Sequence, residues 1–267
     1  MVTAPSKQMF FASFFQKRSA FLAPAAFGVL GLLIWQGAVW WLQVPQYVLP
    51  GPIAIVNAYM GDYAVLNAAL LSTLTVTAAA LVVSATLGVV LALAMAASSL
   101  ARAAIQPWAV ILQVTPVVAI APLIILWVNQ PFLALVVCAT IVAFFPVLSN
   151  TAAGLAATPA DLLDLFMLNG ASRWQTLFLL RLPAALPYFL AGLRISGTLA
   201  LVGAVVAEFV AGSGGFASGL AYRILEAGYR LEIPRMFAAL VLLALAGIAI
   251  YGALGLFAHL MLRRRET

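Results

Sequence analysis

Residues 103–160 read AAIQPWAVILQVTPVVAIAPLIILWVNQPFLALVVCATIVAFFPVLSNTAAGLAATPA, and these 58 residues contain no Asp, Glu, Lys or Arg. A helix that crosses the hydrocarbon core of a bilayer needs about 20 apolar residues, so the stretch has room for two such helices. Asn129-Gln130-Pro131 interrupts the stretch with residues that favour a turn. The sequence therefore predicts one membrane span at about 105–128 and a second at about 132–148.

The rest of the chain follows the same pattern. Charged residues are also missing from 19–61, 63–101 and 236–262, and each of these gaps is long enough for one span. The chain is 66% hydrophobic and 7% charged, whereas a soluble domain is about 25% charged. We predict an all-α polytopic membrane protein with about six transmembrane helices, at about 21–42, 70–97, 105–128, 132–148, 188–210 and 237–262.

The distribution of basic residues predicts the sidedness of the chain. Six spans place both termini on one side, together with nine basic residues: Lys7, Lys17, Arg18, Arg102, Arg173, Arg181, Arg263, Arg264 and Arg265. The other side holds three: Arg223, Arg230 and Arg235. The positive-inside rule then predicts cytoplasmic N- and C-termini, a cytoplasmic loop at about 150–187 and an outer loop at about 212–235. Residues 1–20 form a cytoplasmic N-terminal segment, and residues 21–267 form a single transmembrane domain.

Several functions lack the residues that they need. The basic residues are too scattered along the sequence to form a nucleic-acid-binding surface, although the net charge is +6. No G-x-x-x-x-G-K-[ST] motif is present to bind the phosphates of ATP. His259 is the one histidine, and no G-x-S-x-G occurs, so a Ser–His pair for an intramembrane enzyme is missing. We expect a non-catalytic subunit that binds no cofactor, no metal and no nucleic acid.

The cytoplasmic loop has the pattern of two short helices joined by a glycine. Thr158-Pro159 is typical of a helix start, Gly170 of a helix end, and Ser172 of a second helix start. Pro183 and Pro187 should stop the second helix and direct the chain into the span at 188–210. We predict a compact helix–turn–helix on the membrane surface.

This loop carries the most distinctive pattern in the chain, Asp164-Leu165-Phe166-x3-Gly170-x9-Leu180-Arg181-Leu182-Pro183. It resembles the signature E-A-A-x3-G-x9-I-x-L-P of permeases in binding-protein-dependent ABC importers. Asp164 stands in for Glu, and Leu165 and Phe166 replace the two alanines. The resemblance continues over further stretches between about residue 45 and the end: Leu112-Gln113-Val114-Thr115-Pro116, Ala121-Pro122-Leu123, Asn150-Thr151-x2-Gly154-Leu155, Gly170-Ala171-Ser172-Arg173-Trp174, Leu182-Pro183-Ala184-Ala185-Leu186-Pro187-Tyr188, Ala191-Gly192-Leu193-Arg194 and Val206-Ala207-Glu208-Phe209. In this detail the chain looks like the nitrate/sulfonate/taurine group, which includes riboflavin and hydroxymethylpyrimidine permeases.

The resemblance implies a type I ABC importer permease fold in the bacterial cytoplasmic (inner) membrane. It implies that a soluble or lipid-anchored binding protein delivers a small solute, either a sulfonate- or nitrate-like anion or a pyrimidine- or riboflavin-like heterocycle. Two separate ATPase subunits would bind ATP and Mg, and a second copy of the permease would complete a homodimer. The coupling contacts to the ATPase would then involve Asp161, Asp164, Leu165, Phe166, Gly170, Ala171, Ser172, Arg173, Leu182 and Pro183.

Two groups of residues are candidates for the translocation path. Arg194, Thr198 and Glu208 fall on one stripe of the span at 188–210 by their helical spacing. A charge within the bilayer is costly, so this stripe should face protein or water. Pro116 and Pro122 should bend the span at 105–128 beside Gln113 and Thr115. The alternatives are that both charges reach the two membrane interfaces and that the bend is a buried packing kink.

Other readings of the sequence remain open. A secondary carrier driven by an ion gradient usually needs several mid-membrane acids or histidines, whereas Glu208 is the one candidate here. An intramembrane enzyme is the less favoured alternative. Arg223, Glu226 and Arg230 share one face of the outer segment, and this face is either solvated or a docking site or gate for the binding protein. Trp40, Trp41 and Tyr47 are typical of anchoring at a membrane interface.

Overall fold

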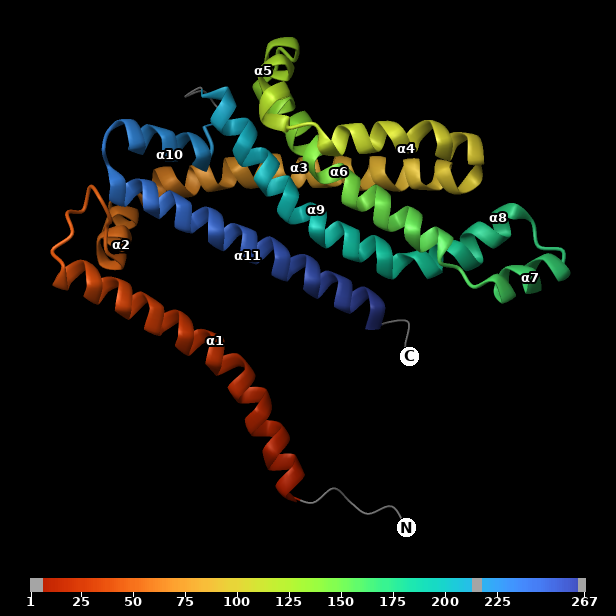
Figure 1. The fold of residues 1–267 in the computed structure, drawn as a ribbon, viewed down its shortest axis with the longest axis horizontal. Helices are drawn as coiled ribbons and strands as arrows, with labels where there is room; N and C mark the ends of the chain where they lie inside the picture. The colour runs from red at the N-terminus through yellow and green to blue at the C-terminus, as the bar shows by residue number, and fades with distance from the viewer. Residues whose placement is uncertain (1–6, 213–217, 264–267) are drawn as a thin grey trace.

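The computed structural model describes residues 7–212 and 218–263, and over these residues it consists of helices and the turns between them. The helices are α1 Lys7–Trp41, α2 Pro52–Gly61, α3 Tyr63–Ala97, α4 Ser99–Val114, α5 Val117–Trp127, α6 Pro131–Ala156, α7 Ala160–Leu168, α8 Arg173–Thr176, the π-helical turn Leu177–Arg181, α9 Leu182–Ala211, α10 Leu220–Tyr229 and α11 Ile233–Arg263 (Figure 1). The prediction of an all-α chain is confirmed. Residues 1–6 of the N-terminal segment, the middle of the outer glycine-rich loop and Arg264 and Arg265 lie outside the described residues.

Four of the six predicted spans correspond to single long apolar helices. Within the described ranges, four helical segments are long and apolar enough to cross a membrane: Tyr63–Ala97, Pro131–Ala156, Arg173–Ala211 and Ile233–Arg263. The bent pair α4 and α5 makes a fifth if it counts as one span. The predicted first span falls in α1, whose apolar part Ala26–Trp41 is a shorter apolar helix. The chain is a multi-pass membrane protein.

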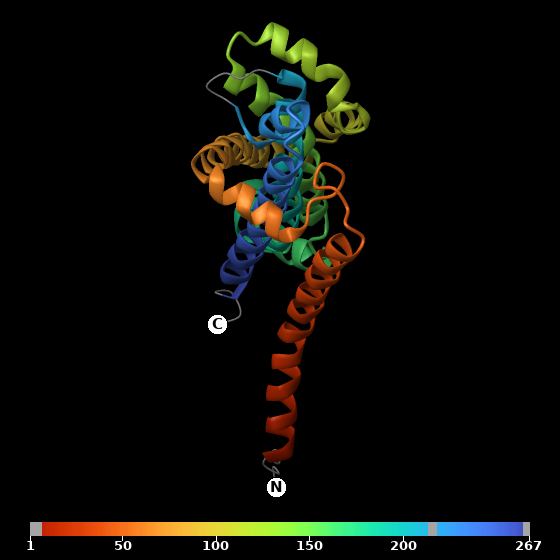
Figure 2. The same ribbon diagram turned by 90° about the vertical axis from the view of Figure 1, so that its left-hand side faces the viewer.

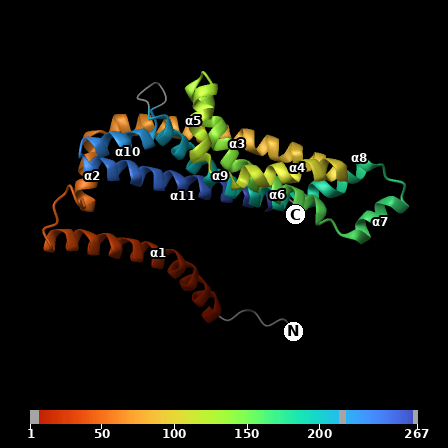
Figure 3. The same cartoon turned by 45° about the horizontal axis from the view of Figure 1, so that its top comes forward.

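Small residues hold the central helices close together. Helices α3, α6, α9 and α11 lie side by side along the long axis of the molecule (Figures 1 and 3), with α6 and α9 in contact. A stripe of small buried residues runs down α3 at a spacing of four: Ala80, Ser84, Gly88 and Ala92. A Cβ atom on Gly88 would lie 2.8 Å from Cβ of Val147 on α6. Acyl chains are as apolar as the helix surfaces, so the hydrophobic effect does not bring helices together in lipid. Close approach of the backbones drives their association instead, because it increases van der Waals contact.

The span with three prolines is broken, as the sequence predicts. Helix α4 ends at Val114, α5 begins at Val117, and the two axes meet at an angle of 101°. The break lies at Pro116, which has no N–H to continue the helical hydrogen bonds. Pro107 and Pro122 lie inside α4 and α5. Figure 1 shows α4 alongside α3, whereas α5 turns away from the bundle axis.

The two predicted loops lie at opposite ends of the molecule. Helices α7 and α8 form one end of the bundle, and α2 and α10 form the other (Figure 1). Helix α1 leaves the bundle at the α2 end and extends away from it (Figure 2). Its contacts include a tilted ring pair between Trp35 and Phe237 and a hydrogen bond from the Ile53 N–H to Oε1 of Gln36. The arrangement separates the loop that contains α7 and α8 from the loop that contains α10 by the length of the spans.

Candidate functional site

The turn at Gly170 is the centre of the helix–turn–helix between α6 and α9. Gly170 has φ +71°, its N–H donates to the carbonyl of Met167, and the Ala171 N–H donates to the carbonyl of Phe166. These two bonds are those of a Schellman motif, in which glycine is favoured because a Cβ atom destabilises positive φ. The predicted glycine turn is present.

Ser172 begins the second helix with a capping box. The Gln175 N–H donates to Oγ of Ser172 at 3.2 Å, and the Ser172 N–H donates to Oε1 of Gln175 at 2.7 Å. This reciprocal pair satisfies amide donors that the first turn would leave without partners. The predicted start of the first helix is wrong in detail, because α7 begins at Ala160 and Thr158 donates instead to the carbonyl of Leu155.

The two prolines do not end the second helix, and this corrects the sequence prediction. The chain is helical from Arg173 to Ala211, including Pro183 and Pro187. Residues Leu177–Arg181 form a π-helical turn, in which the Leu182 N–H donates to the carbonyl of Leu177. The wider π turn lies just before Pro183, whose nitrogen has no hydrogen to continue the helical bonds. Helix α8 is therefore continuous with α9 through this turn.

The surface of α7 and α8 is exposed and largely apolar, and it carries two acids and the exposed Arg173. Helix α7 buries none of its residues, and Asp161 and Asp164 are exposed three positions apart, on one face. Several large apolar side chains are exposed beside them: Leu162, Leu165, Met167, Leu168, Trp174, Phe178 and Leu179. The rings of Trp174 and Phe178 stack with centroids 6.0 Å apart. An exposed apolar patch of this kind marks an interaction site. We call residues 160–179 the knob.

Glu208 is the centre of a second polar site, at the opposite end of the bundle. Glu208 is 3% exposed. Its Oε1 accepts a hydrogen bond of 2.8 Å from the Thr73 hydroxyl, and its Oε2 accepts one of 3.1 Å from the Ala221 N–H. The Thr73 Oγ1 in turn accepts one of 2.9 Å from the Leu220 N–H. The carboxylate therefore satisfies the first turn of α10, where backbone donors and the helix dipole favour a negative charge.

Gly219 makes room for this carboxylate. A Cβ atom at position 219 would overlap the carboxylate atoms of Glu208, so a side chain there would displace the acid. The sequence identified Glu208 as an intramembrane charge but did not identify Thr73 or Gly219 as its neighbours. The signal that could have found Gly219 is a lone acid at the end of a span, followed by a glycine before the next helix.

A network of ion pairs holds the other end of α10. Glu226 pairs with Arg223 at 2.7 Å and with Arg230 at 2.9 Å. Nε of Arg235 lies 2.5 Å from Oδ2 of Asp62, and Arg235 also pairs with Glu232 at 2.9 Å. The Arg223 guanidinium that donates to Glu226 holds the pKa of that carboxyl below its ordinary value. The network joins α10 to the start of α3 and to α11.

Leu231 lies in the turn between α10 and α11 with φ +60°. Its N–H donates to the carbonyl of Gly228 and the Glu232 N–H donates to that of Ala227, so this turn is also a Schellman motif. Leucine occupies the position at which glycine is usual, and the Leu231 side chain is 75% exposed.

The predicted path residues lie in separate places. The Arg194 guanidinium lies 3.7 Å from the ring centroid of Tyr251 on α11, and the Thr198 hydroxyl donates to the carbonyl of Ile195. Arg194, Thr198 and Glu208 are thus not brought together. The other set lies at the α4–α5 break, where the surface of the single chain includes exposed Gln113, Pro116 and Pro122 and partly buried Thr115.

Comparisons with known proteins agree with this architecture. Residues 84–264 match the family model described as a binding-protein-dependent transport system inner membrane component. A probable ABC transporter permease protein of Haemophilus influenzae is 34% identical over 87% of this chain and 93% of its own length. The formylaminopyrimidine transport permease protein ThiX of Halalkalibacterium halodurans is 32% identical over 92% of this chain and 96% of its own. The riboflavin transport system permease protein RibX of Chloroflexus aurantiacus is 40% identical over 57% of this chain and 55% of its own.

Proposed function

This chain belongs to the family of binding-protein-dependent transport system inner membrane components, and from that premise we propose how it couples solute transport to ATP hydrolysis. It is an ABC importer permease for a small solute and a multi-pass protein of the bacterial inner membrane. In our proposal two copies of the chain form a homodimer, two separate ATPase subunits bind ATP and Mg, and a soluble or lipid-anchored binding protein delivers the solute.

The knob is the proposed contact with the ATPase. The observation that carries this assignment is the exposed apolar and acidic surface of α7 and α8, on a turn fixed by Gly170 and Ser172. The continuous helix from Arg173 to Ala211 connects this surface to the membrane interior. Closure of the ATPase pair would move the knob and open the permease to the outer side. This orientation, with both termini and the knob in the cytoplasm, rests on the excess of basic residues at that side.

The transported solute is proposed to be a heterocycle of the pyrimidine or riboflavin type. The relatives named for the transport of formylaminopyrimidine and of riboflavin are 32% and 40% identical to this chain, whereas those named for aliphatic sulfonates and for taurine are each 29% identical. The higher identities support the heterocycle over the sulfonate- or nitrate-like anion. The binding protein would supply most of the selectivity, because the spans contain few polar side chains that could recognise a solute.

The α4–α5 break is the proposed lining of the path. Proline at 116 leaves backbone carbonyls without helical partners, and Gln113 adds an exposed amide beside them. The break lies on the surface of the single chain, so a second copy would have to enclose it. For Arg194, Thr198 and Glu208 a place in the path stays a prediction, since Arg194 would have to leave Tyr251 on α11 and Glu208 would have to leave its partners on α3 and α10.

Transport by purified components tests the proposal. The full chain is reconstituted in liposomes with its ATPase and binding protein, and uptake of radiolabelled pyrimidine, riboflavin and taurine is measured. We expect uptake of one heterocycle that requires ATP, the ATPase and the binding protein together. Uptake by the chain alone, driven by an ion gradient, would establish the secondary-carrier alternative instead. Turnover of a substrate into product would establish the enzyme alternative.

Asp164 gives a narrower test of the knob. Asp164→Lys should lose ATPase association and uptake while the permease still inserts into the membrane, because a cation replaces the acid on the contact face. Ala157→Lys is the matched control, since it adds the same cation at an exposed position outside α7. A reciprocal charge change on the ATPase should restore part of the activity. If Asp164→Lys binds the ATPase as well as wild type does, the carboxylate makes no contact with the ATPase.

A further inference from the structure

A groove of about 290 Å³ lies between α4 and α6, near the end of the bundle that carries the knob. The residues that line it come from the start of α4, the last three turns of α6 and the end of α3. Four alanines, at positions 109, 152, 153 and 156, keep the two helices from filling the space between them. The volume is near the lower end of the range for small-molecule sites, about 300–1,000 Å³.

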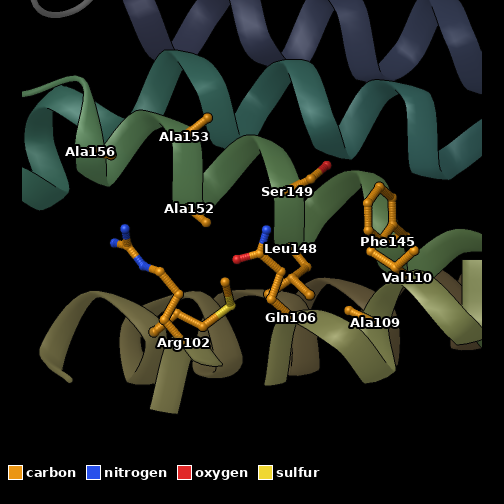
Figure 4. A pocket seen from close by; sticks show the side chains of 11 residues that line it. Arg102, Gln106, Ala109, Val110, Phe145, Leu148, Ser149, Ala152, Ala153 and Ala156 are labelled. Carbon is orange, nitrogen blue, oxygen red and sulfur yellow. The ribbon is translucent and has the colours of Figure 1, made fainter. Parts of the chain in front are cut away.

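The lining changes from charged to apolar along the groove. Arg102, Gln106 and Val110 follow one another at intervals of four along α4, and therefore occupy one face of that helix. Arg102 lies at the end of the groove near Ala156, and Val110 lies at the other end near Phe145 (Figure 4). Figure 4 also shows that the side chains of Arg102 and Gln106 extend from α4 toward α6. The groove thus has its charged side chain at the end near Ala156 and mainly apolar side chains at the other end, and the Ser149 hydroxyl between them donates to the carbonyl of Pro146.

The Arg102 guanidinium has no partner from the described part of the chain. The ion pairs between described residues involve Arg223, Arg230 and Arg235, and no hydrogen bond among the described residues uses the guanidinium of Arg102. A guanidinium has five N–H donors in a planar fork, a geometry that matches a phosphate group. A single cation above an apolar floor fits a ligand that has both an anionic head and an apolar tail.

We propose that this groove binds an anionic phospholipid of the cytoplasmic leaflet. The phosphate lies at Arg102 and Gln106, and one acyl chain follows Ala109, Leu148 and Phe145 toward the membrane centre. The direction of the polarity gradient carries the assignment, because it matches the orientation of a phospholipid whose headgroup faces the same side as the knob. Basic pockets between spans at the cytoplasmic side are sites of this kind. Only the identification of the leaflet as cytoplasmic depends on the proposed orientation of the chain.

Native mass spectrometry of the detergent-solubilised full chain tests the proposal. Phosphatidylglycerol, phosphatidylcholine and inorganic phosphate are each titrated into the delipidated protein. We expect one phosphatidylglycerol to be retained more strongly than phosphatidylcholine, and inorganic phosphate not to displace it. Arg102→Gln should weaken phosphatidylglycerol binding about five-fold, which corresponds to about 1 kcal/mol for one basic residue at an anionic lipid. Ala152→Leu narrows the groove beside Arg102 and Gln106 and should weaken both lipids.

Arg263→Gln is the matched control, since it removes a basic residue at the end of α11 outside the groove. It should leave lipid binding unchanged. The proposal is overturned if Arg102→Gln binds phosphatidylglycerol like wild type, or if phosphatidylcholine binds equally well. It is also overturned if inorganic phosphate displaces the lipid, which would make the groove a site for a free anion. These measurements are made in detergent without an ATPase. A failed transport assay would therefore contradict the proposed transport function and not the lipid site.

Discussion

Removal of the Glu208 carboxylate should make α10 open from the bundle more often. This acid is buried and accepts hydrogen bonds from the Thr73 hydroxyl and the Ala221 N–H, and Thr73 accepts one from the Leu220 N–H. No residue of α10 itself caps its first turn through a side chain. The helix therefore depends on an acid from α9 and a hydroxyl from α3 at its N-terminal end.

The size of the effect follows from the groups that Glu208→Ala leaves unpaired. A buried donor without a partner costs about 1–3 kcal/mol, and two such donors remain: the Thr73 hydroxyl and the Ala221 N–H. The lost charge at the helix N-terminus adds about 0.3–1 kcal/mol. The free energy of opening α10 should therefore fall by roughly 2–7 kcal/mol. Glu208→Gln keeps the shape and one acceptor but also removes the charge, so its effect should be roughly 1–4 kcal/mol, the cost of a single unpaired donor and of the lost charge.

Cysteine labelling measures this opening directly. Ala227 on α10 is buried, and Cys138, the one native cysteine, is buried in the bundle. In an Ala227→Cys background, the rate of reaction with a maleimide reports the fraction of molecules in which α10 is open. A decrease of about 3 kcal/mol in the opening free energy should raise this rate more than 100-fold, since about 1.4 kcal/mol is tenfold.

Thr75→Val is the matched control for Thr73→Val. The Thr75 hydroxyl is exposed and donates to the carbonyl of Ser72, away from the Glu208 site. In the Ala227→Cys background, Thr73→Val should accelerate labelling at position 227, whereas Thr75→Val should not. If Glu208→Ala labels at the wild-type rate, the acid does not hold α10, and the reasoning is refuted.

Three further predictions concern the two turns and the ion-pair network. Gly170→Val meets no atom within 4 Å of its Cβ, so its cost is backbone strain of order 1–3 kcal/mol; it should insert normally but co-purify less ATPase, and unchanged uptake would contradict this. Leu231→Gly relieves the positive φ and should raise the melting temperature by about 2–4 °C, as for about 1 kcal/mol in a chain of this size; a lower melting temperature would mean that the leucine makes a stabilising contact. Glu226→Gln should lower the melting temperature at pH 7. Because Arg223 holds the folded pKa of Glu226 below its unfolded value of about 4.3, the contribution of the carboxylate is complete above that unfolded value and is lost as the pH falls through the folded one. The difference between Glu226→Gln and wild type should therefore shrink below about pH 4, and a pH-independent difference would refute the assignment.

The positions of the spans could be predicted from the sequence because each depends on a local property. A run of about 20 residues without charge is recognisable without knowledge of its neighbours. The ends of the helices could not be predicted in this way. The predicted span at 70–97 is part of α3, which begins at Tyr63, because a helix continues past the membrane boundary until a residue such as Asp62 ends the pattern of backbone bonds.

The two Schellman turns show the limit of residue preferences. The turn at Gly170 was predicted because glycine is the usual residue at positive φ. The turn at Leu231 has the same two backbone bonds and a similar φ, but leucine gives no signal of it. In the same way, Pro183 predicted a helix end, whereas the π-helical turn before it accommodates the proline within a continuous helix. The local preference of a residue determines the backbone conformation only where tertiary contacts do not favour a different one.

The partners of Glu208 lay beyond sequence reasoning for a different reason. Its charge marks it as unusual within a span, but Thr73 is 135 positions away in the chain and looks like any small residue of an apolar helix. Only the packing of α3 against α9 brings the hydroxyl and the acid together. The α4–α6 groove could not be predicted either. Alanines on a single transmembrane helix predict close packing, and they give no sign of the space that they leave between α4 and α6.

The helix from Arg173 to Ala211 connects the two polar sites of the chain. It has 39 residues, so at 1.5 Å per residue it is about 58 Å long. Its first turn belongs to the knob and is fixed by Ser172, whereas Glu208 lies in its last turn and holds α10. Glycines at 192 and 203 bring its backbone against Pro146 and Ala139 of α6, so a tilt of this helix must also move α6 or separate the two. In the proposed mechanism, a displacement of the knob by an ATPase would therefore reach the N-terminus of α10 through this one helix and the hydrogen bonds of Glu208.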